Sequence, residues 1–361
     1  TQVTTIVGSF IASYIIFALT YELGKYLIAK MEGFKFISFR FFSSVRCINE
    51  EGKTKSYKQK VLFKVMDLKM YKDDNKTKKS AIVYCLGGSI FNFIIALALI
   101  IAASVMKDGN NIRSILYIIG ITGLFNIALN IIPMNSTTPN DGSYLKTIVE
   151  DDESLKLFYT LMDYHKHLCN HKPTEFDSNK FNLKQNFNPN NPVHAYAYSY
   201  QVKHLIYKRE FQNAFNLIQQ NEMNNDLLID DVMFDLKLKA IFLKTMLNND
   251  AEALEDRDNL TGDSKDAAKA KTIDRAIENY AFFKFSNMDE YAAEEAYDEA
   301  IAYAKTVDLV TILQYVAEQK ADISETAYFS LEVETVVECE DPEDGTENID
   351  TVYQRDIWID G

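Results

Sequence analysis

The chain has 361 residues, of which 47% are hydrophobic, and a formal net charge of -14 at pH 7. This length can hold two domains, and the apolar and basic residues lie in the first part whereas the acidic residues lie in the second. No basic patch with interleaved aromatic residues appears, so we expect no nucleic acid partner. The cysteines lack Cys-x-x-Cys spacing, which predicts reduced thiols: Cys47, Cys85, Cys169 and Cys339.

Three apolar runs are each long enough to cross a bilayer, which takes about 20 mostly apolar residues. They cover residues 3–19 with a continuation to 31, 81–106 and 112–134. The alternative for each is a buried helix of a soluble protein, but residues 91–105 carry no charge and the third run carries only Arg113. No small-residue cleavage site follows the first run, so we expect a retained membrane helix and not a signal peptide.

The first run continues into Thr20-Tyr21-Glu22-Leu23-Gly24-Lys25. On a helix, Tyr21 and Lys25 share one face, with Glu22 beside Tyr21. This is the spacing of the zinc-protease motif His-Glu-x-x-His, in which the two histidines bind the metal and the glutamate activates water. A tyrosine and a protonated lysine cannot replace two neutral imidazoles, because the ammonium group repels a cation.

Lysine residues crowd the segment between the first two apolar runs, from residue 53 to residue 79. The positive-inside rule places this segment in the cytoplasm, the N-terminus outside, the chain after Met134 inside and a short external loop at 107–111. Residues 36–41 partly alternate apolar with polar, residues 50–53 supply a turn, and residues 57–66 supply a return strand. This pattern predicts a small β-hairpin.

Two further motifs lie at the edges of the later apolar runs. Residues 86–94 begin Leu-Gly-Gly-Ser and include Asn92, and Asn130-Ile131-Ile132-Pro133 is followed by Pro139-Asn140-Asp141-Gly142. With the first helix, these motifs make residues 1–150 resemble the site-2 protease family of intramembrane zinc metalloproteases. That family has His-Glu-x-x-His on one membrane helix, Gly-Gly-Pro-x-x-Asn on the next, and Asn-Pro-x-Asp-Gly at the end of a third.

The resemblance assigns a role to each matching position. Glu22 stands at the catalytic glutamate and Asp141 at the third metal ligand, while Tyr21 and Lys25 replace the histidine ligands. Ser89 and Thr138 replace a family proline and asparagine. The remaining matches are structural motif positions: Gly87, Gly88, Asn92, Pro139 and Gly142. In the family, a β-hairpin after the first helix guides substrate, and the predicted hairpin resembles it; a surface hairpin without that role is the alternative.

Loss of the histidines bears directly on the chemistry. A catalytic zinc needs about three protein ligands, and only Asp141 remains, so we expect no cofactor and no hydrolysis. We hypothesise that Lys25 replaces the metal as the cation, bridges Glu22 and Asp141, and joins the first and third membrane helices, with Tyr21 hydrogen-bonded to the same carboxylates. The alternative is that Lys25 extends to the membrane surface.

Helical periodicity replaces the apolar runs after Gly142. Asp151-Asp152-Glu153 suits a helix start, and prolines and asparagines predict a loop over 170–192. Four residues of metal-ligand type occupy alternating positions just before and within this loop: His165, His167, Cys169 and His171. They indicate either a metal site or an exposed polar segment.

Three helix pairs are predicted beyond residue 195, with turns about 40 residues apart. Their spans are 196–207 with 211–220, 232–247 with 250–260, and 269–285 with 289–305. The spacing resembles tetratricopeptide-type repeats, which offer a concave surface to a peptide or protein; an irregular helical bundle is the alternative. The acidic tail from residue 332 is expected to be solvated and weakly ordered, although residues 352–353 and 357–359 suit a short strand or anchor.

The predicted protein is mainly α-helical. Its membrane core of three helices and a small β-hairpin spans 1–148, a connecting segment 149–193, a cytosolic helical-repeat domain 194–331 and an acidic tail 332–361. The expected function is a catalytically degenerate site-2-protease-like protein that binds lipid and a membrane or peptide partner in a bacterial cell membrane, with its C-terminal domain in the cytoplasm. The alternatives are an active intramembrane metalloprotease holding zinc and an accessory subunit of a membrane export system.

Overall fold

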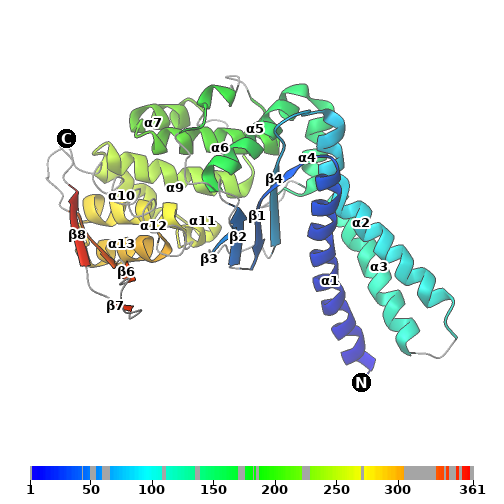
Figure 1. Ribbon diagram of the computed structural model, residues 1–361. Helices are drawn as coiled ribbons and strands as arrows, with labels where there is room; N and C mark the ends of the chain where they lie inside the picture. The colour runs from blue at the N-terminus through cyan, green and yellow to red at the C-terminus, as the bar shows by residue number, and fades with distance from the viewer. Residues whose placement is uncertain are drawn as a thin grey trace. The chain divides into compact units, whose positions relative to one another are not determined.

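The computed structural model in Figure 1 forms two compact units, Thr1–Ala240 and Ile241–Gly361. The predicted domain limits at residues 148, 193 and 331 stay predictions. The residues that the structure describes are 2–42, 44–48, 54–58, 66–107, 111–134, 139–169, 175–181, 183, 187–221, 228–269, 272–304, 331–336, 339–340, 347–348 and 352–357.

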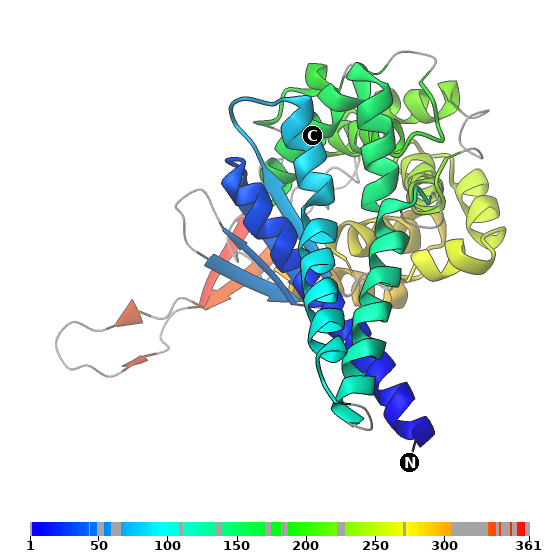
Figure 2. The same ribbon diagram turned by 90° about the vertical axis from the view of Figure 1, so that its right-hand side faces the viewer.

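Three long helices form the apolar part of the first unit: α1 (Gln2–Met31), α2 (Lys78–Ser104) and α3 (Asn111–Ile131). Each is long and apolar enough to cross a membrane, which confirms the three predicted runs. Each of the three packs against the other two, as the two views show (Figures 1 and 2). Gly123 of α3 lies so close to the ring of Phe17 on α1 that a β-carbon there would overlap the ring.

Helix α1 ends in a left-handed glycine turn. Gly33 has φ +85°, the Phe34 amide donates to the Ala29 carbonyl over 3.0 Å, and the Gly33 amide donates to the Lys30 carbonyl over 3.1 Å. This is the Schellman pattern that closes helix C-termini. The buried ammonium group of Lys72 also donates to the Glu32 carbonyl, which places a positive charge at the negative end of the helix.

A four-stranded antiparallel sheet follows α1. Its strands are β1 (Lys35–Phe41), β2 (Ser44–Ile48), β3 (Thr54–Lys58) and β4 (Met66–Tyr71), in the order β3-β2-β1-β4. The predicted first strand is confirmed, but it pairs with both β2 and β4, so the element is larger than one hairpin. The predicted turn over 50–53 and most of the predicted return strand, residues 59–65, lie outside the described residues.

Three helices after the apolar part complete one shared core with the sheet: α4 (Asp141–Glu150), α5 (Asp152–Cys169) and α6 (Pro192–Tyr207). Buried Ile148, Phe158 and Val193 from these helices join Met70 of β4 and Tyr84 of α2 in a single hydrophobic cluster. The ends of α1 and α2 are therefore anchored in the same core as α4, α5 and α6.

The remaining helices match the predicted pairs closely. They are α7 (Phe211–Gln220), α9 (Asp230–Met246), α10 (Asp250–Asp258), α11 (Gly262–Ala267), α12 (Ile273–Ala281) with the π-helical segment η3 (Phe282–Ser286), and α13 (Glu290–Ala304). Each pair turns through a residue with positive φ, namely Arg209, Asn248 and Met288, at intervals of 39 and 40 residues.

The second helix of each pair carries a buried alanine at the equivalent position: Ala214, Ala253 and Ala293. Each alanine amide donates to the carbonyl of the residue that follows the left-handed turn residue. A small side chain at this point permits close packing, so three helical hairpins share one local construction.

Short antiparallel strands occupy part of the acidic tail. Strand β5 (Leu331–Val336) pairs with β8 (Val352–Ile357), and β6 (Cys339–Glu340) pairs with β7 (Glu347–Asn348). The predicted short strand near residue 352 is thus present as β8.

Candidate functional site

The motif side chains of α1 converge on one carboxylate. The Lys25 ammonium donates to both oxygens of Asp141 over 2.8 Å, and the Tyr21 hydroxyl donates to Asp141 Oδ2 over 2.5 Å. The side chains of Lys25 and Asp141 are only 10% and 16% exposed. Lys25 therefore points into the protein as an ion-pair partner and does not extend to the solvent.

Asp141 belongs to a separate short helix, which corrects the predicted link between the first and third membrane helices. Helix α3 ends at Ile131, before Pro133, and Asp141 is the first residue of α4. The ion pair therefore joins α1 to the N-terminus of α4. The positive end of the α4 dipole adds to the positive charge of Lys25 around this carboxylate.

Asn140 fixes the start of α4 against the end of α3. Its side-chain oxygen accepts from the Ser143 amide over 3.0 Å, while its Nδ2 donates to the carbonyls of Leu129 over 2.7 Å and Ile132 over 2.6 Å. Asn140 and Asp141 thus hold α3, α4 and α1 together. Gly142 is required here because a β-carbon would overlap the Ile131 carbonyl.

The glycine motif of α2 lets α1 approach the site closely. A β-carbon on Gly88 would lie 2.7 Å from the Tyr21 ring, and one on Gly87 would lie 3.2 Å from the Lys25 α-carbon. Neither position tolerates a larger residue without moving Tyr21 or Lys25. The two glycines therefore help to orient the Tyr21 and Lys25 side chains.

Asn92, one turn further along α2, ties the two helices together. It is fully buried, its Nδ2 donates to the Phe17 carbonyl over 2.9 Å, and its Oδ1 accepts from the Thr20 hydroxyl over 2.7 Å. Two interhelical hydrogen bonds satisfy an amide that apolar surroundings could not. The predicted motif residue Asn92 thus has two partners on neighbouring positions of α1, Phe17 and Thr20.

Tyr84 is a site residue that the sequence reasoning missed. Its ring centroid lies 4.6 Å from Lys25 Nζ, and its hydroxyl donates to the Leu68 carbonyl over 3.3 Å. A cation over an aromatic face gains a further electrostatic contact. The available signal was its spacing three residues before Gly87, which places Tyr84 on the side of α2 that faces α1.

The donor set around Asp141 does not fit a zinc ion. Both carboxylate oxygens already accept hydrogen bonds from a cation and a hydroxyl, and the two motif positions supply no neutral nitrogen. Among the described residues, no group of three or more His, Cys, Asp or Glu side chains is placed to hold a metal ion.

Glu22 is half-buried beside Tyr21 on α1, and its predicted contact with Lys25 stays a prediction. Pro139 is buried just before α4.

The histidine-rich stretch lies mostly on helix α5. The Tyr200 hydroxyl is 3.2 Å from His165 Nε2, and the His167 ring packs against Phe176 at 5.5 Å between centroids. These rings face different neighbours because alternating residues of a helix point in different directions. His171 lies outside the described residues.

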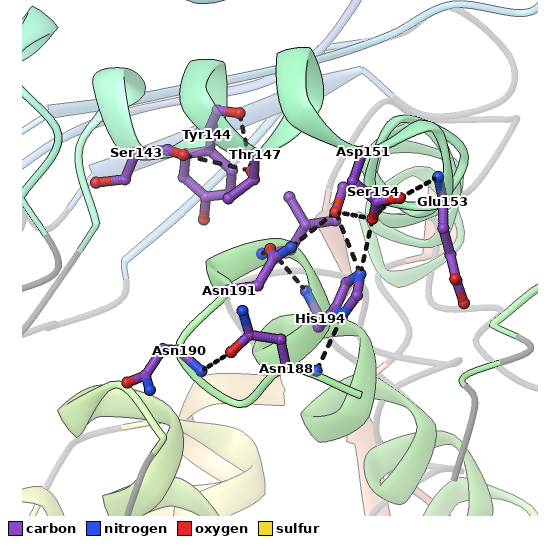
Figure 3. Close-up of polar contacts among 11 residues, drawn as sticks. Ser143, Tyr144, Thr147, Asp151, Glu153, Ser154, Asn188, Asn190, Asn191 and His194 are labelled. Atoms are coloured by element: carbon purple, nitrogen blue, oxygen red, sulfur yellow. Dashed lines mark hydrogen bonds and ion pairs between the residues drawn. The ribbon is translucent and has the colours of Figure 1, made fainter. Parts of the chain in front are cut away.

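A serine, a histidine and an aspartate meet at the start of α5 (Figure 3). Ser154 Oγ donates to Asp151 Oδ2 over 2.7 Å and lies 3.2 Å from His194 Nε2. His194 Nδ1 accepts from the Asn188 amide over 3.3 Å. A neutral His194 therefore carries its proton on Nε2, where a serine nucleophile would need an acceptor.

This second cluster joins two helix starts. Asp151 accepts from the amides of Glu153 and Ser154, and Asn191 accepts from the amide of Val193 while its Nδ2 donates to Ser154 Oγ. Burial alone would raise the pKa of Asp151, but these hydrogen bonds and the nearby His194 lower it below its usual value. The cluster caps the N-termini of two helices, α5 and α6, and is not a catalytic triad.

Comparison of the chain with protein-family models, with curated proteins and with solved structures finds no match.

Proposed function

We propose that this chain is a catalytically degenerate protein of the site-2 protease type that binds a membrane segment or a peptide without cleaving it. The observation that carries the proposal is the Lys25 ammonium group, which donates to both oxygens of Asp141 at the place where the family resemblance expects a metal. An ammonium and a divalent cation cannot share one carboxylate at these distances, because like charges repel.

A fold that keeps the architecture around its metal site but lacks the metal ligands still has the helix arrangement that would bind a membrane segment or a peptide. Gly87, Gly88, Asn92 and Gly142 all make the close contacts that hold α1, α2, α3 and α4 together. Without an activated water, Glu22 has no nucleophile to deprotonate. The expected activity is therefore retention, shielding or presentation of a membrane partner.

The three helical hairpins from α6 to α13 supply the proposed second contact. Each hairpin repeats a left-handed turn and a buried alanine at an interval of 39 or 40 residues. In helical-repeat proteins, arrays of such hairpins expose a surface that suits an extended peptide or a protein. We place this region in the cytoplasm of a bacterial cell, on the side of the lysine-rich sheet.

The test is a cleavage assay on the full chain purified in detergent and supplied with zinc. Membrane-segment peptides are incubated with the wild type and with Glu22→Gln, and the products are separated by mass. The expected result is no cleavage above the Glu22→Gln level. Cleavage by the wild type that Glu22→Gln abolishes would contradict the proposal and favour the active protease.

A further inference from the structure

The turn of the third helical hairpin differs from the turns of the other two. The residue with positive φ is polar in the first two hairpins, Arg209 and Asn248, but it is Met288 in the third, with φ +52°. The left-handed conformation is unfavourable for a long apolar side chain, and Met288 is 81% exposed, so burial within the chain does not offset that cost. This difference indicates a surface with a role other than folding.

A second large apolar side chain lies three positions further along, at the start of α13. Tyr291 is 80% exposed, whereas the equivalent positions of the other two hairpins hold Gln212 and Ala251. Methionine and tyrosine are both enriched at protein interfaces. Of the three described turns, the third is therefore the one that presents two large, exposed apolar side chains.

The third turn is tied to the preceding hairpin. The π-helical segment η3 brings buried Ser286 to the start of α10, where its hydroxyl donates to Asp250 Oδ1 over 2.8 Å. Just before α13, the Asp289 amide donates to the Phe283 carbonyl over 2.8 Å. Because these contacts fix the backbone on both sides of Met288, little conformational entropy would be lost when a partner binds there.

The exposed face of α13 beyond this turn is acidic. Four exposed residues share this face through their i, i+3, i+4 and i+7 spacing: Tyr291, Glu294, Glu295 and Asp298. The opposite face packs against α12, where Ala293 and Tyr280 belong to one hydrophobic cluster (Figure 1). Residues 290–304 contain five acidic residues and no basic residue, so α13 supplies no cation of its own to its exposed face.

The charge of this face limits the kinds of partner that could cover it. The carboxylates would repel anionic lipid headgroups and nucleic acid, and they would repel the same face of a second copy in a symmetric dimer. Lysine or arginine side chains would be attracted, and apolar side chains between them would cover Met288 and Tyr291. The complementary occupant is therefore a basic segment of another protein that also carries apolar residues.

We infer that Met288, Tyr291 and the acidic face of α13 form a docking surface for such a basic, partly apolar peptide segment. This inference rests on the proposed second contact through the helical hairpins, and it gives the chemistry of the partner. It does not depend on whether the chain cleaves peptides, so the cleavage assay and the binding experiment can fail separately.

The experiment measures peptide binding by the full chain in nanodiscs of phosphatidylcholine, a lipid without net charge, with empty nanodiscs as the blank. The probe is a fluorescein-labelled peptide of repeated Lys-Leu-Lys-Phe units, and a peptide of Glu-Leu-Glu-Phe units is the control for apolar contact alone. Fluorescence anisotropy gives the dissociation constant. We expect the wild type to bind the lysine peptide, more weakly as salt screens the charges, and not to bind the glutamate peptide.

Two sets of substitutions divide the docking surface. Met288→Ser with Tyr291→Ser removes the apolar pair, whereas Glu294→Gln and Glu295→Gln with Asp298→Asn remove the charges. Each set should weaken binding about fivefold to tenfold without lowering the melting temperature, since every altered side chain is exposed. The matched control neutralises three exposed carboxylates on α10 and α11 and should bind as the wild type does: Glu255→Gln, Asp258→Asn and Asp266→Asn.

Several results would overturn the inference. If the wild type does not bind the lysine peptide, or binds the glutamate peptide equally well, the chemistry of the partner is wrong. If either α13 set binds like the wild type, or the α10–α11 control loses as much affinity as the α13 charge variant, the peptide does not bind at this surface. If Met288→Ser with Tyr291→Ser converts an oligomer to a monomer in detergent but leaves peptide binding unchanged, a second copy covers the surface.

Discussion

Two carboxylates, Asp141 and Asp151, both lie at helix starts but have opposite kinds of partner. Asp141, at the start of α4, is 16% exposed and is neutralised by the full charge of Lys25. Asp151, before α5, is 42% exposed and accepts mainly from neutral donors, namely the Ser154 hydroxyl and two backbone amides. The difference follows from solvent: a carboxylate that water reaches needs only a cap, whereas a carboxylate at the end of apolar helices needs a cation.

The largest effect is expected from removing that cation. Lys25→Met leaves the Asp141 charge buried and unpaired, which should lower the free energy of unfolding by about 3–5 kcal/mol. Thermal unfolding in detergent measures this loss. The double variant Lys25→Met with Asp141→Asn should recover a large part of it, since no buried charge remains. An unchanged melting temperature in Lys25→Met would contradict a structural ion pair.

A smaller effect is expected from crowding the helix contact beside the cluster. Gly88→Ala places a β-carbon 2.7 Å from the Tyr21 ring, and such overpacking costs about 1–3 kcal/mol. The control is Gly8→Ala on α1, where nothing lies within 4 Å and stability should be unchanged or slightly raised. Equal melting temperatures for the two variants would mean that α1 and α2 do not approach each other as described.

Removing the solvent-exposed carboxylate should cost less than removing the buried cation. Asp151→Ala deletes a helix cap, which typically costs about 1 kcal/mol. Because the folded pKa of Asp151 is lowered, its contribution is present at neutral pH and is lost as pH falls through that lowered pKa, below about pH 4. Unfolding of wild type and Asp151→Ala should therefore converge in acid. A difference that grows in acid would show that Asp151 acts in another way.

The smallest effect is expected from removing one hydrogen bond of Asn92. Hydrogen bonds between membrane helices contribute about 0.6 kcal/mol on average, so Thr20→Val, which removes the bond from the Thr20 hydroxyl to Asn92 Oδ1, should lower the melting temperature only slightly. Asn92→Ala removes this bond and the bond to the Phe17 carbonyl, and serves as the paired variant with the larger loss. A loss as large as that of Lys25→Met would place Asn92, and not the ion pair, at the centre of helix association.

Local pattern was sufficient for the helices and for part of the site. Charge-free runs predicted α1, α2 and α3, and a four-residue spacing placed Tyr21 and Lys25 on one face of α1, because each of these depends on one helix alone. The partnership of Tyr21 and Lys25 with Asp141 was predicted only through the resemblance to the site-2 protease family. The repeating turns were visible as a period of about 40 residues.

Contacts between distant segments were not predictable in the same way. Spacing from Gly87 places Tyr84 on the side of α2 that faces α1 but does not identify Lys25 as its partner, and nothing local places Asn191 and His194 against Ser154 about 40 residues earlier. Pro133 gave a reason for α3 to end, but only the Asn140 contacts with Leu129 and Ile132 show that Asp141 starts a new helix. The sheet extends beyond one hairpin because β4, which lies within the lysine-rich segment 53–79, pairs with β1.

The central claim is that the Lys25 ammonium group occupies the position of a metal ion, and zinc binding tests it most directly. Purified wild type and the double variant Tyr21→His with Lys25→His are dialysed against zinc, and the bound metal is measured per chain by elemental analysis. We expect about one equivalent in the double variant, lost again on adding Asp141→Asn, and none in the wild type. One equivalent in the wild type that Asp141→Asn removes would contradict it.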